Sequence, residues 1–289
     1  MAAAACASLL TLAAMASPAG ATGRPPKVVP PKAYYLSVGD SMAFGLQFDK
    51  LDRLLEAGTY SPDAFDTGYT DVLGARMRQL HPGQQTANFS CPGETTATMV
   101  EGGCFFTNPE PEGAGLTLHL PYPGSQLDAA VWFLKAHPGQ VSPVTVSIGG
   151  IDAANVIGDE CGGDAACVEQ SGLSDRLARG LDRILGTLRQ AAPDTEIVLV
   201  ALHNPFTVDH PETDTLWRST YTKVERAAAR RNGARFSDFS KVVERGDACQ
   251  LTFLCGSGDS HPTDEGYRRI AGQVFRVAGY ERLVRCGRK

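Results

Sequence analysis

The residues best suited to do chemistry together are a serine near the start of the chain and a histidine near its end. Ser41 follows Gly39 at the end of the apolar run AYYLSV (33–38), where a turn can expose its hydroxyl and its backbone N–H together. A serine hydroxyl becomes a useful nucleophile only when a base accepts its proton and hydrogen-bond donors hold the developing oxyanion. His261 in GDSHPTDEGY is the candidate base, and Asp259, two residues earlier, is placed to orient its ring. These residues predict nucleophilic catalysis by Ser41.

Each of these stretches also has a plainer structural explanation. Asp40 or Ser41 could simply cap the helix that follows, as short polar residues often do. A histidine before Pro262 at the start of a helix is commonly structural as well. Catalysis accounts for the two stretches together. A histidine in a turn fixed by Pro262, directly before a helix that begins near Thr263, can reach across the strand ends to Ser41.

Apolar runs and amphipathic stretches alternate along the chain. Short apolar runs typical of buried strands lie at 33–38, 85–90, 144–150, 196–202 and 234–240. Apolar spacings of three and four predict a helix over 173–192, and further helices follow at 213–233 and from Thr263 onward. This alternation predicts a doubly wound α/β domain with a mainly parallel, roughly five-stranded sheet. Such domains bind ligands beyond the carboxyl ends of the strands, where Ser41 lies.

Charge and composition exclude some partners. The 289 residues carry a net charge of −5, without a long basic run or stripe. A nucleic-acid partner is therefore not expected, because the electrostatic attraction that dominates such binding has no patch through which to act. There is no GxxxxGK motif, and the Gly149-Gly150 pair is too short a signal for a dinucleotide site. We expect no cofactor.

The N-terminal segment differs in composition from the rest. Residues 1–21 are rich in alanine and leucine and end in Ala-Gly-Ala, which has the small-x-small form of a signal-peptidase site. The apolar stretch is shorter than the about 20 residues that a membrane span needs. We therefore expect a cleaved secretory signal over 1–21, a stiff proline-rich spacer over 22–32 and a folded domain over 33–289. The mature protein is expected to be secreted, with no integral membrane association.

Cysteine usage agrees with export. If Cys6 leaves with the signal, all but one of the remaining cysteines form neighbouring pairs in loop-rich stretches. Proximity alone favours the disulfides Cys91–Cys104, Cys161–Cys167 and Cys249–Cys255. Cys286 is then free or pairs between chains. We expect no metal, because no paired CxxC occurs and the nearby histidines are scattered.

Four blocks of the sequence together carry a resemblance to a known family. GDSM at 39–42, Gly93 in CPGETT, the Gly-Gly-x-Asp loop at 149–152 and the C-terminal HPT-x-x-GY resemble the motifs of the GDSL/SGNH hydrolases. The resemblance is to the secreted actinobacterial esterases and lipases in particular, and it extends from about Ala33 to Arg285. It implies a three-layer α/β/α sandwich with a flavodoxin-like sheet.

The resemblance also implies roles for residues of this chain. Ser41 would be the nucleophile and His261 the general base, while backbone N–H groups of Ser41 and Gly93 would hold the oxyanion. A third donor in the family is the asparagine of a G-x-N-D loop, but Ile151 stands there and its side chain cannot donate. Losing one such donor typically lowers turnover about 10²–10³-fold. Asn155, a turn further on, could substitute only if the loop is rearranged.

A second departure from the family pattern concerns the acid. Many members carry an aspartate three residues before the histidine, where this chain has Gly258. Either Asp259 orients His261, or a backbone carbonyl near Gly258 does so.

Three functions follow from the residues and the resemblance. The first is a secreted, monomeric serine esterase or lipase that acts on a small-molecule ester or lipid through an acyl-enzyme and is weakened by Ile151. The second is a catalytically impaired ligand-binding protein, and the third is a carbohydrate deacetylase. The Gly- and Pro-rich excursion at 99–127 serves either as an acyl-binding wall or as a disulfide-tied surface loop. The G-x-S-x-G elbow of α/β-hydrolases is disfavoured, because Ala43 occupies its last position.

Overall fold

The computed structural model describes residues 28–109, 111, 113–243 and 247–286. The expected signal at 1–21, most of the expected spacer at 22–32 and Cys6 lie outside the described residues. No helix in the described part of the chain is both long and apolar enough to cross a membrane.

A parallel five-stranded sheet forms the centre of the described chain. Its strands are β1 (Tyr34–Gly39), β2 (Gln85–Asn88), β3 (Val141–Ser147), β4 (Ile197–Ala201) and β5 (Arg235–Asp238). They lie in the order β2-β1-β3-β4-β5, and every neighbouring pair is parallel. Each overlaps one of the five expected runs, so the predicted α/β fold is confirmed. β3 is displaced toward the N-terminus of its expected run, because the chain turns into a helix at Gly150.

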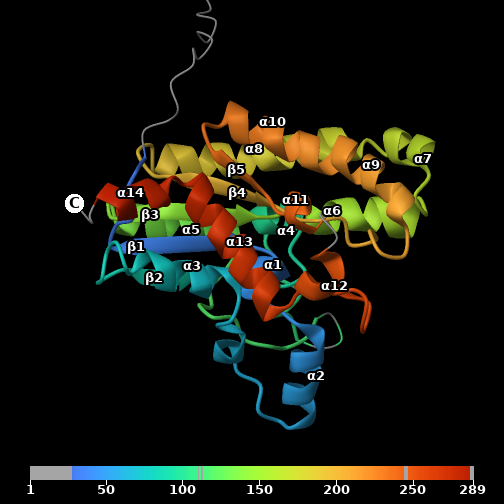
Figure 1. Ribbon diagram of the computed structural model, residues 1–289, viewed down its shortest axis with the longest axis horizontal. Helices are drawn as coiled ribbons and strands as arrows, with labels where there is room; N and C mark the ends of the chain where they lie inside the picture. The colour runs from blue at the N-terminus through green and yellow to red at the C-terminus, as the bar shows by residue number, and fades with distance from the viewer. Residues whose placement is uncertain (1–27, 110, 112, 244–246, 287–289) are drawn as a thin grey trace, which may run out of the picture.

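Helices cover both faces of the sheet (Figure 1). α5 (Gln126–Ala136), α8 (Leu173–Ala191) and α10 (Lys223–Arg231) pack on one face. α3 (Tyr69–Met77) and α13 (Asp264–Val277) pack on the other face. β3 and β4 are buried along their whole length, as expected for parallel strands covered on both sides. The result is the expected three-layer α/β/α sandwich.

Shorter elements connect these layers. They are α1 (Ser41–Phe44), α2 (Phe48–Glu56), η1 (Pro62–Phe65), α4 (Thr96–Glu101), α6 (Gly150–Ala154), η2 (Asn155–Glu160), α7 (Ala165–Gln170), η3 (Pro211–Thr213), α9 (Asp214–Trp217), η4 (Arg218–Thr222), α11 (Ser240–Val242), α12 (Ala248–Leu251), β6 (Thr252–Phe253), β7 (Asp259–Pro262) and α14 (Tyr280–Cys286). The three local disulfides favoured by proximity are present, joining Cys91 to Cys104, Cys161 to Cys167 and Cys249 to Cys255.

Two expected elements differ in detail. The single helix expected over 213–233 is a succession of η3, α9, the π-helical η4 and α10. The π-helical turn lies where the Tyr221 hydroxyl accepts a hydrogen bond from the Leu202 N–H at 3.1 Å. The turn expected around His261 is instead the short strand β7, which pairs antiparallel with β6. The helix that follows begins as expected, with the Thr263 side chain as its N-cap.

The excursion at 99–127 packs against the segment that carries Ser41. Phe106 and Leu118 join Phe44 in a small apolar cluster, to which the Cys91–Cys104 disulfide also belongs. His119 extends this contact, because its Nε2 lies 3.0 Å from the Phe44 carbonyl oxygen. The excursion is therefore part of the same domain and packs against the last residue of α1.

Candidate active site

Ser41 lies where β1 gives way to helix α1, at the carboxyl edge of the sheet. Asp40 caps this helix, since its Oδ1 accepts a hydrogen bond from the Met42 N–H at 3.0 Å. Gly39 has a φ of 143°, and a Cβ at this position would overlap the Ser147 carbonyl of β3. Glycine lets β1 lie this close to β3 in a conformation that other residues rarely adopt. The turn thereby fixes the position of Ser41.

His261 links Ser41 to an aspartate. Its Nε2 lies 2.8 Å from Ser41 Oγ, and its Nδ1 lies 2.5 Å from Oδ1 of Asp259. An ionised carboxylate can only accept hydrogen bonds, so the ring proton belongs on Nδ1. Nε2 is then the acceptor for the Ser41 hydroxyl. The structure brings these three predicted residues together, although Ser41 and His261 are 220 positions apart.

Asp259 is held in its ionised form by the groups around it. Its Oδ1 accepts the His261 backbone N–H at 2.9 Å, and its Oδ2 accepts the Phe48 N–H at 3.0 Å. Burial by itself would raise the pKa of Asp259, but the His261 ring and these N–H groups outweigh burial and hold the pKa below its ordinary value. Of the two ways to orient the ring, the structure has the Asp259 carboxylate against Nδ1.

Two backbone N–H groups near this end of the sheet are free to bind a ligand. The turn that contains Gly93 lies against the end of β1, because the Cys91 N–H donates to the Gly39 carbonyl at 2.9 Å. Gly93 has a φ of 86°, which favours glycine at this position. Neither the Ser41 N–H nor the Gly93 N–H donates a backbone hydrogen bond within the described residues.

Ile151 is the second residue of α6, and its side chain lines a cavity beside Ser41. Asn155, the candidate substitute, is exposed at the start of η2 and does not line that cavity. Asp152 has a different use. Its carboxylate accepts both the N–H of Thr96, at 2.9 Å, and the Thr96 hydroxyl, at 2.6 Å, and so ties the loop after β3 to helix α4.

Gln126, which no sequence pattern identifies, holds the end of β1 through both of its amide atoms. Its Oε1 accepts the Gly39 N–H at 2.5 Å, and its Nε2 donates to the Gly39 carbonyl at 3.0 Å. The same Nε2 lies 3.3 Å from Oε2 of Glu94, whose burial raises its pKa to about 7. A polar residue at the start of the apolar segment QLDAAVWFL is the only trace of this role in the sequence.

A cavity of about 80 Å³ opens beside Ser41. It lies at the carboxyl ends of β1, β3 and β4, where doubly wound folds bind their ligands. Its lining is mainly apolar, with a few polar groups. The lining residues are Asp40, Ser41, Met42, Gly150, Ile151, Ala154, Leu202, His203, Pro205, Trp217 and Ser260.

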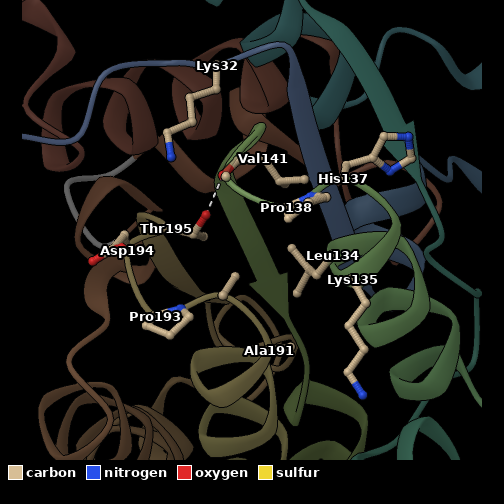
Figure 2. Close-up of a pocket in the computed structure, with 12 residues that line it drawn as sticks. Lys32, Leu134, Lys135, His137, Pro138, Val141, Ala191, Pro193, Asp194 and Thr195 are labelled. Carbon is tan, nitrogen blue, oxygen red and sulfur yellow. Dashed lines mark hydrogen bonds between the residues drawn. The ribbon is translucent and has the colours of Figure 1, made fainter.

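A larger cavity of about 320 Å³ lies near the start of β3, remote from these strand ends (Figure 2). Lys32, Lys135 and His137 are at its margin, and the Thr195 hydroxyl donates to the Val141 carbonyl within it. This cavity is at the amino end of the sheet, opposite the edge that carries Ser41. Of these two cavities, the smaller one adjoins Ser41.

Two groups of side chains in the described residues have the spacing of metal ligands. Cys91, Glu94 and Cys104 form one group, but the two cysteines are joined by a disulfide and offer no thiolate. The other group, Asp63, Asp66 and His119, is largely exposed. Neither group includes Ser41, His261 or Asp259.

Comparison with known proteins identifies the family. Residues 37–269 match the model of the GDSL-like lipase/acylhydrolase family. The chain belongs to this family. The GDSL assignment spans both Ser41 and His261, and it agrees with the resemblance seen in the four sequence blocks. A search of curated proteins finds no match.

Solved structures similar to this GDSL family member share its fold at low identity. A lipase from a goat rumen metagenome is 17% identical, with a TM-score of 0.56 over 86% of this chain and 97% of that chain. An extracellular lipase from Streptomyces rimosus is 16% identical, with a TM-score of 0.55 over 83% and 98%. An acetyl xylan esterase from Geobacillus stearothermophilus is 15% identical, with a TM-score of 0.55 over 88% and 97%.

The raised pKa of Glu94 predicts a pH-dependent contribution to stability. Its folded-state pKa of about 7 exceeds the ordinary value of 4.5, so the folded state binds more protons between these two values. Stability from this group therefore falls as the pH rises through that window. We expect Glu94→Gln, which cannot ionise, to remove the effect. The free energy of unfolding of the parent, relative to the variant, should decrease between about pH 5 and about pH 8.

Urea unfolding at the two pH values measures this difference. Glu101→Gln, at an exposed carboxylate at the end of α4, is the matched control. If the difference in unfolding free energy between the parent and Glu94→Gln were the same at both pH values, Glu94 would not have the raised pKa assigned to it.

Proposed function

We propose that the chain is a secreted serine ester hydrolase that works through an acyl-enzyme. The observation that carries the proposal is the 2.8 Å separation between Ser41 Oγ and His261 Nε2, with Asp259 2.5 Å from the other ring nitrogen. The same arrangement of side chains activates a serine toward acyl carbonyls on unrelated folds. Membership of a lipase and acylhydrolase family supports the ester as the substrate class.

The reaction has two half-reactions. In the first, Ser41 Oγ attacks the ester carbonyl carbon while His261 Nε2 takes the hydroxyl proton, and Asp259 stabilises the resulting imidazolium. The N–H groups of Ser41 and Gly93 hold the negative carbonyl oxygen. The carbon–oxygen bond to the alcohol then breaks as His261 returns the proton to the leaving oxygen. In the second half-reaction, water attacks the acyl carbon in the same way and releases the acid and Ser41.

Secretion is proposed from the cysteines and the N-terminal composition. Three disulfides are present, and such bonds persist in oxidising compartments outside the cytosol. Residues 1–21 have the composition of a secretory signal. The similar Streptomyces rimosus lipase is also described as extracellular.

Carbohydrate deacetylation is a second candidate. The cavity beside Ser41 measures about 80 Å³, which suits an acetyl group better than a long fatty chain. One similar structure is an acetyl xylan esterase. An impaired binding protein is less well supported, because the fold does not need the hydrogen bonds among Ser41, His261 and Asp259.

Ser41→Ala tests the catalytic proposal directly. We expect it to lower kcat for p-nitrophenyl acetate about 10⁴-fold or more, because the nucleophile and its base act as a unit. Release of p-nitrophenol measures the rate. Ser257→Ala removes a hydroxyl at an exposed position near His261 and should leave the rate unchanged. If Ser41→Ala hydrolysed the ester as fast as the parent, Ser41 would not be the nucleophile.

Ile151→Asn tests whether the third oxyanion donor is missing. We expect kcat for p-nitrophenyl acetate to rise about 10- to 100-fold, because the amide supplies a hydrogen bond that Ile151 cannot make. Ile151→Ala is the control, since it shortens the same side chain without adding a donor. Equal rates for the parent and the asparagine variant, or the same gain in both variants, would show that no donor is missing.

A further inference from the structure

The cavity beside Ser41 is small, and both apolar and polar residues line it. Six of its lining residues present apolar side chains: Met42, Ile151, Ala154, Leu202, Pro205 and Trp217. Its volume of about 80 Å³ is that of roughly three water-sized groups. It therefore suits an apolar fragment of two to four carbon atoms. Ile151, which fails as a donor, is here part of the apolar wall.

The acyl group of an ester is the fragment that should enter this cavity. It stays bound to Ser41 through both half-reactions, whereas the alcohol must leave and be replaced by water between them. The free N–H of Gly93 lies after β2, and the cavity lies toward β3 and β4, on the other side of β1. With the carbonyl oxygen directed at Gly93, the cavity is on the opposite side of Ser41 and can receive the acyl group.

The polar residues that line the cavity are Asp40, Ser41, His203 and Ser260, and His203 is the one with two unpaired ring nitrogens. Its side chain is 2% exposed, yet neither ring nitrogen has a hydrogen-bond partner in the described part of the chain. Burial, and then the neighbouring His261, lower its pKa to about 4. A contact with the Ser260 backbone, which falls short of hydrogen-bond geometry, opposes this shift. The ring is held edge-on to Phe239, with 5.6 Å between ring centroids. His203 is thus a neutral imidazole at physiological pH.

Leaving such a ring unpaired is costly. A buried polar group without a partner loses the hydrogen bonds it makes with water, which destabilises the fold. A neutral imidazole offers one N–H donor and one nitrogen acceptor, a combination that matches a hydroxyl group. A substrate hydroxyl in this cavity would supply the missing partner.

We propose that the cavity binds a short acyl group that carries a hydroxyl near the carbonyl, and that His203 is the residue that selects it. The substrate class is then esters of short hydroxy acids, of which 3-hydroxybutyrate is a four-carbon example. The inference rests on the proposed function for the identity of the reacting group. It goes further by naming the acid half of the ester and the residue that recognises it.

The test compares p-nitrophenyl esters that differ in the acyl group alone. The parent should favour 3-hydroxybutyryl over butyryl about five- to tenfold in kcat/KM, the effect of about one neutral hydrogen bond. It should turn over the octanoyl ester at least about tenfold less well than the butyryl ester, because the longer chain exceeds the cavity. An octanoyl ester used as well as the butyryl ester would overturn the short-acyl assignment.

Two variants test the selecting residue. His203→Phe keeps a ring against Phe239 but cannot hydrogen-bond, so it should abolish the preference for the 3-hydroxybutyryl ester over the butyryl ester. His203→Gln keeps a donor and an acceptor and should retain part of the preference. A preference that persists in His203→Phe would overturn the role of His203. If the parent itself showed no preference for the 3-hydroxybutyryl ester over the butyryl ester, the proposal would be wrong whatever the variants did.

A binding measurement separates this proposal from the proposed function. Ligand-observed NMR on Ser41→Ala should detect tighter binding of ethyl 3-hydroxybutyrate than of ethyl butyrate, and His203→Phe in the same background should remove the difference. If the parent hydrolyses no ester but the binding difference is present, the proposed function fails and the cavity assignment stands. If esters are hydrolysed but the binding difference is absent, the cavity assignment fails.

Discussion

The hydrogen bond between Ser41 Oγ and His261 Nε2 is the interaction on which the rest of the site depends. It joins the end of the first strand to a short strand 220 residues later, so it exists only if the whole sheet and both helix layers are assembled. Each partner is fixed by a different constraint. Gly39 sets the approach of β1 to β3, and the Asp259 carboxylate sets the tautomer of the ring. The fold thus brings together two side chains that no local segment could pair.

Hydrogen bonds made by Gln126 and Asp152 fix the loops around Ser41. Gln126 pairs with both backbone groups of Gly39, while Asp152 ties the loop after β3 to helix α4. Such groups stabilise a site when they are fully paired and destabilise it when they are not. Gln126 and Asp152 are paired. In contrast, the His203 ring and Oδ2 of Asp40, in the lining of the cavity beside Ser41, have no hydrogen-bond partner in the described residues. The cost of an unpaired buried polar group therefore explains why Gln126 is paired, and it suggests that a substrate hydroxyl pairs with His203.

Much of the fold and the candidate catalytic residues could be predicted from the sequence. Buried parallel strands leave apolar runs, and α8 leaves a leucine stripe, so the layers were predictable. Ser41, Asp259 and His261 were identifiable because their chemistry restricts residue type. Gln126 was not, since its role arises from a contact with the end of β1 that leaves no periodic signal. His203 directly follows the apolar run 196–202, so its place at the carboxyl edge was predictable, but its unpaired ring was not. The strand β7 was expected as a turn, because its pairing with β6 involves only a few residues.

Covalent labelling with a fluorophosphonate tests the central claim most directly, because the reagent reacts with a serine only when a neighbouring base activates it. Mass spectrometry of the labelled protein should find one phosphonyl adduct, on the peptide that contains Ser41. The adduct should form far more slowly in His261→Ala, although Ser41 is still present. A parent that takes up no label, labels at another serine, or labels equally fast without His261 would contradict the account.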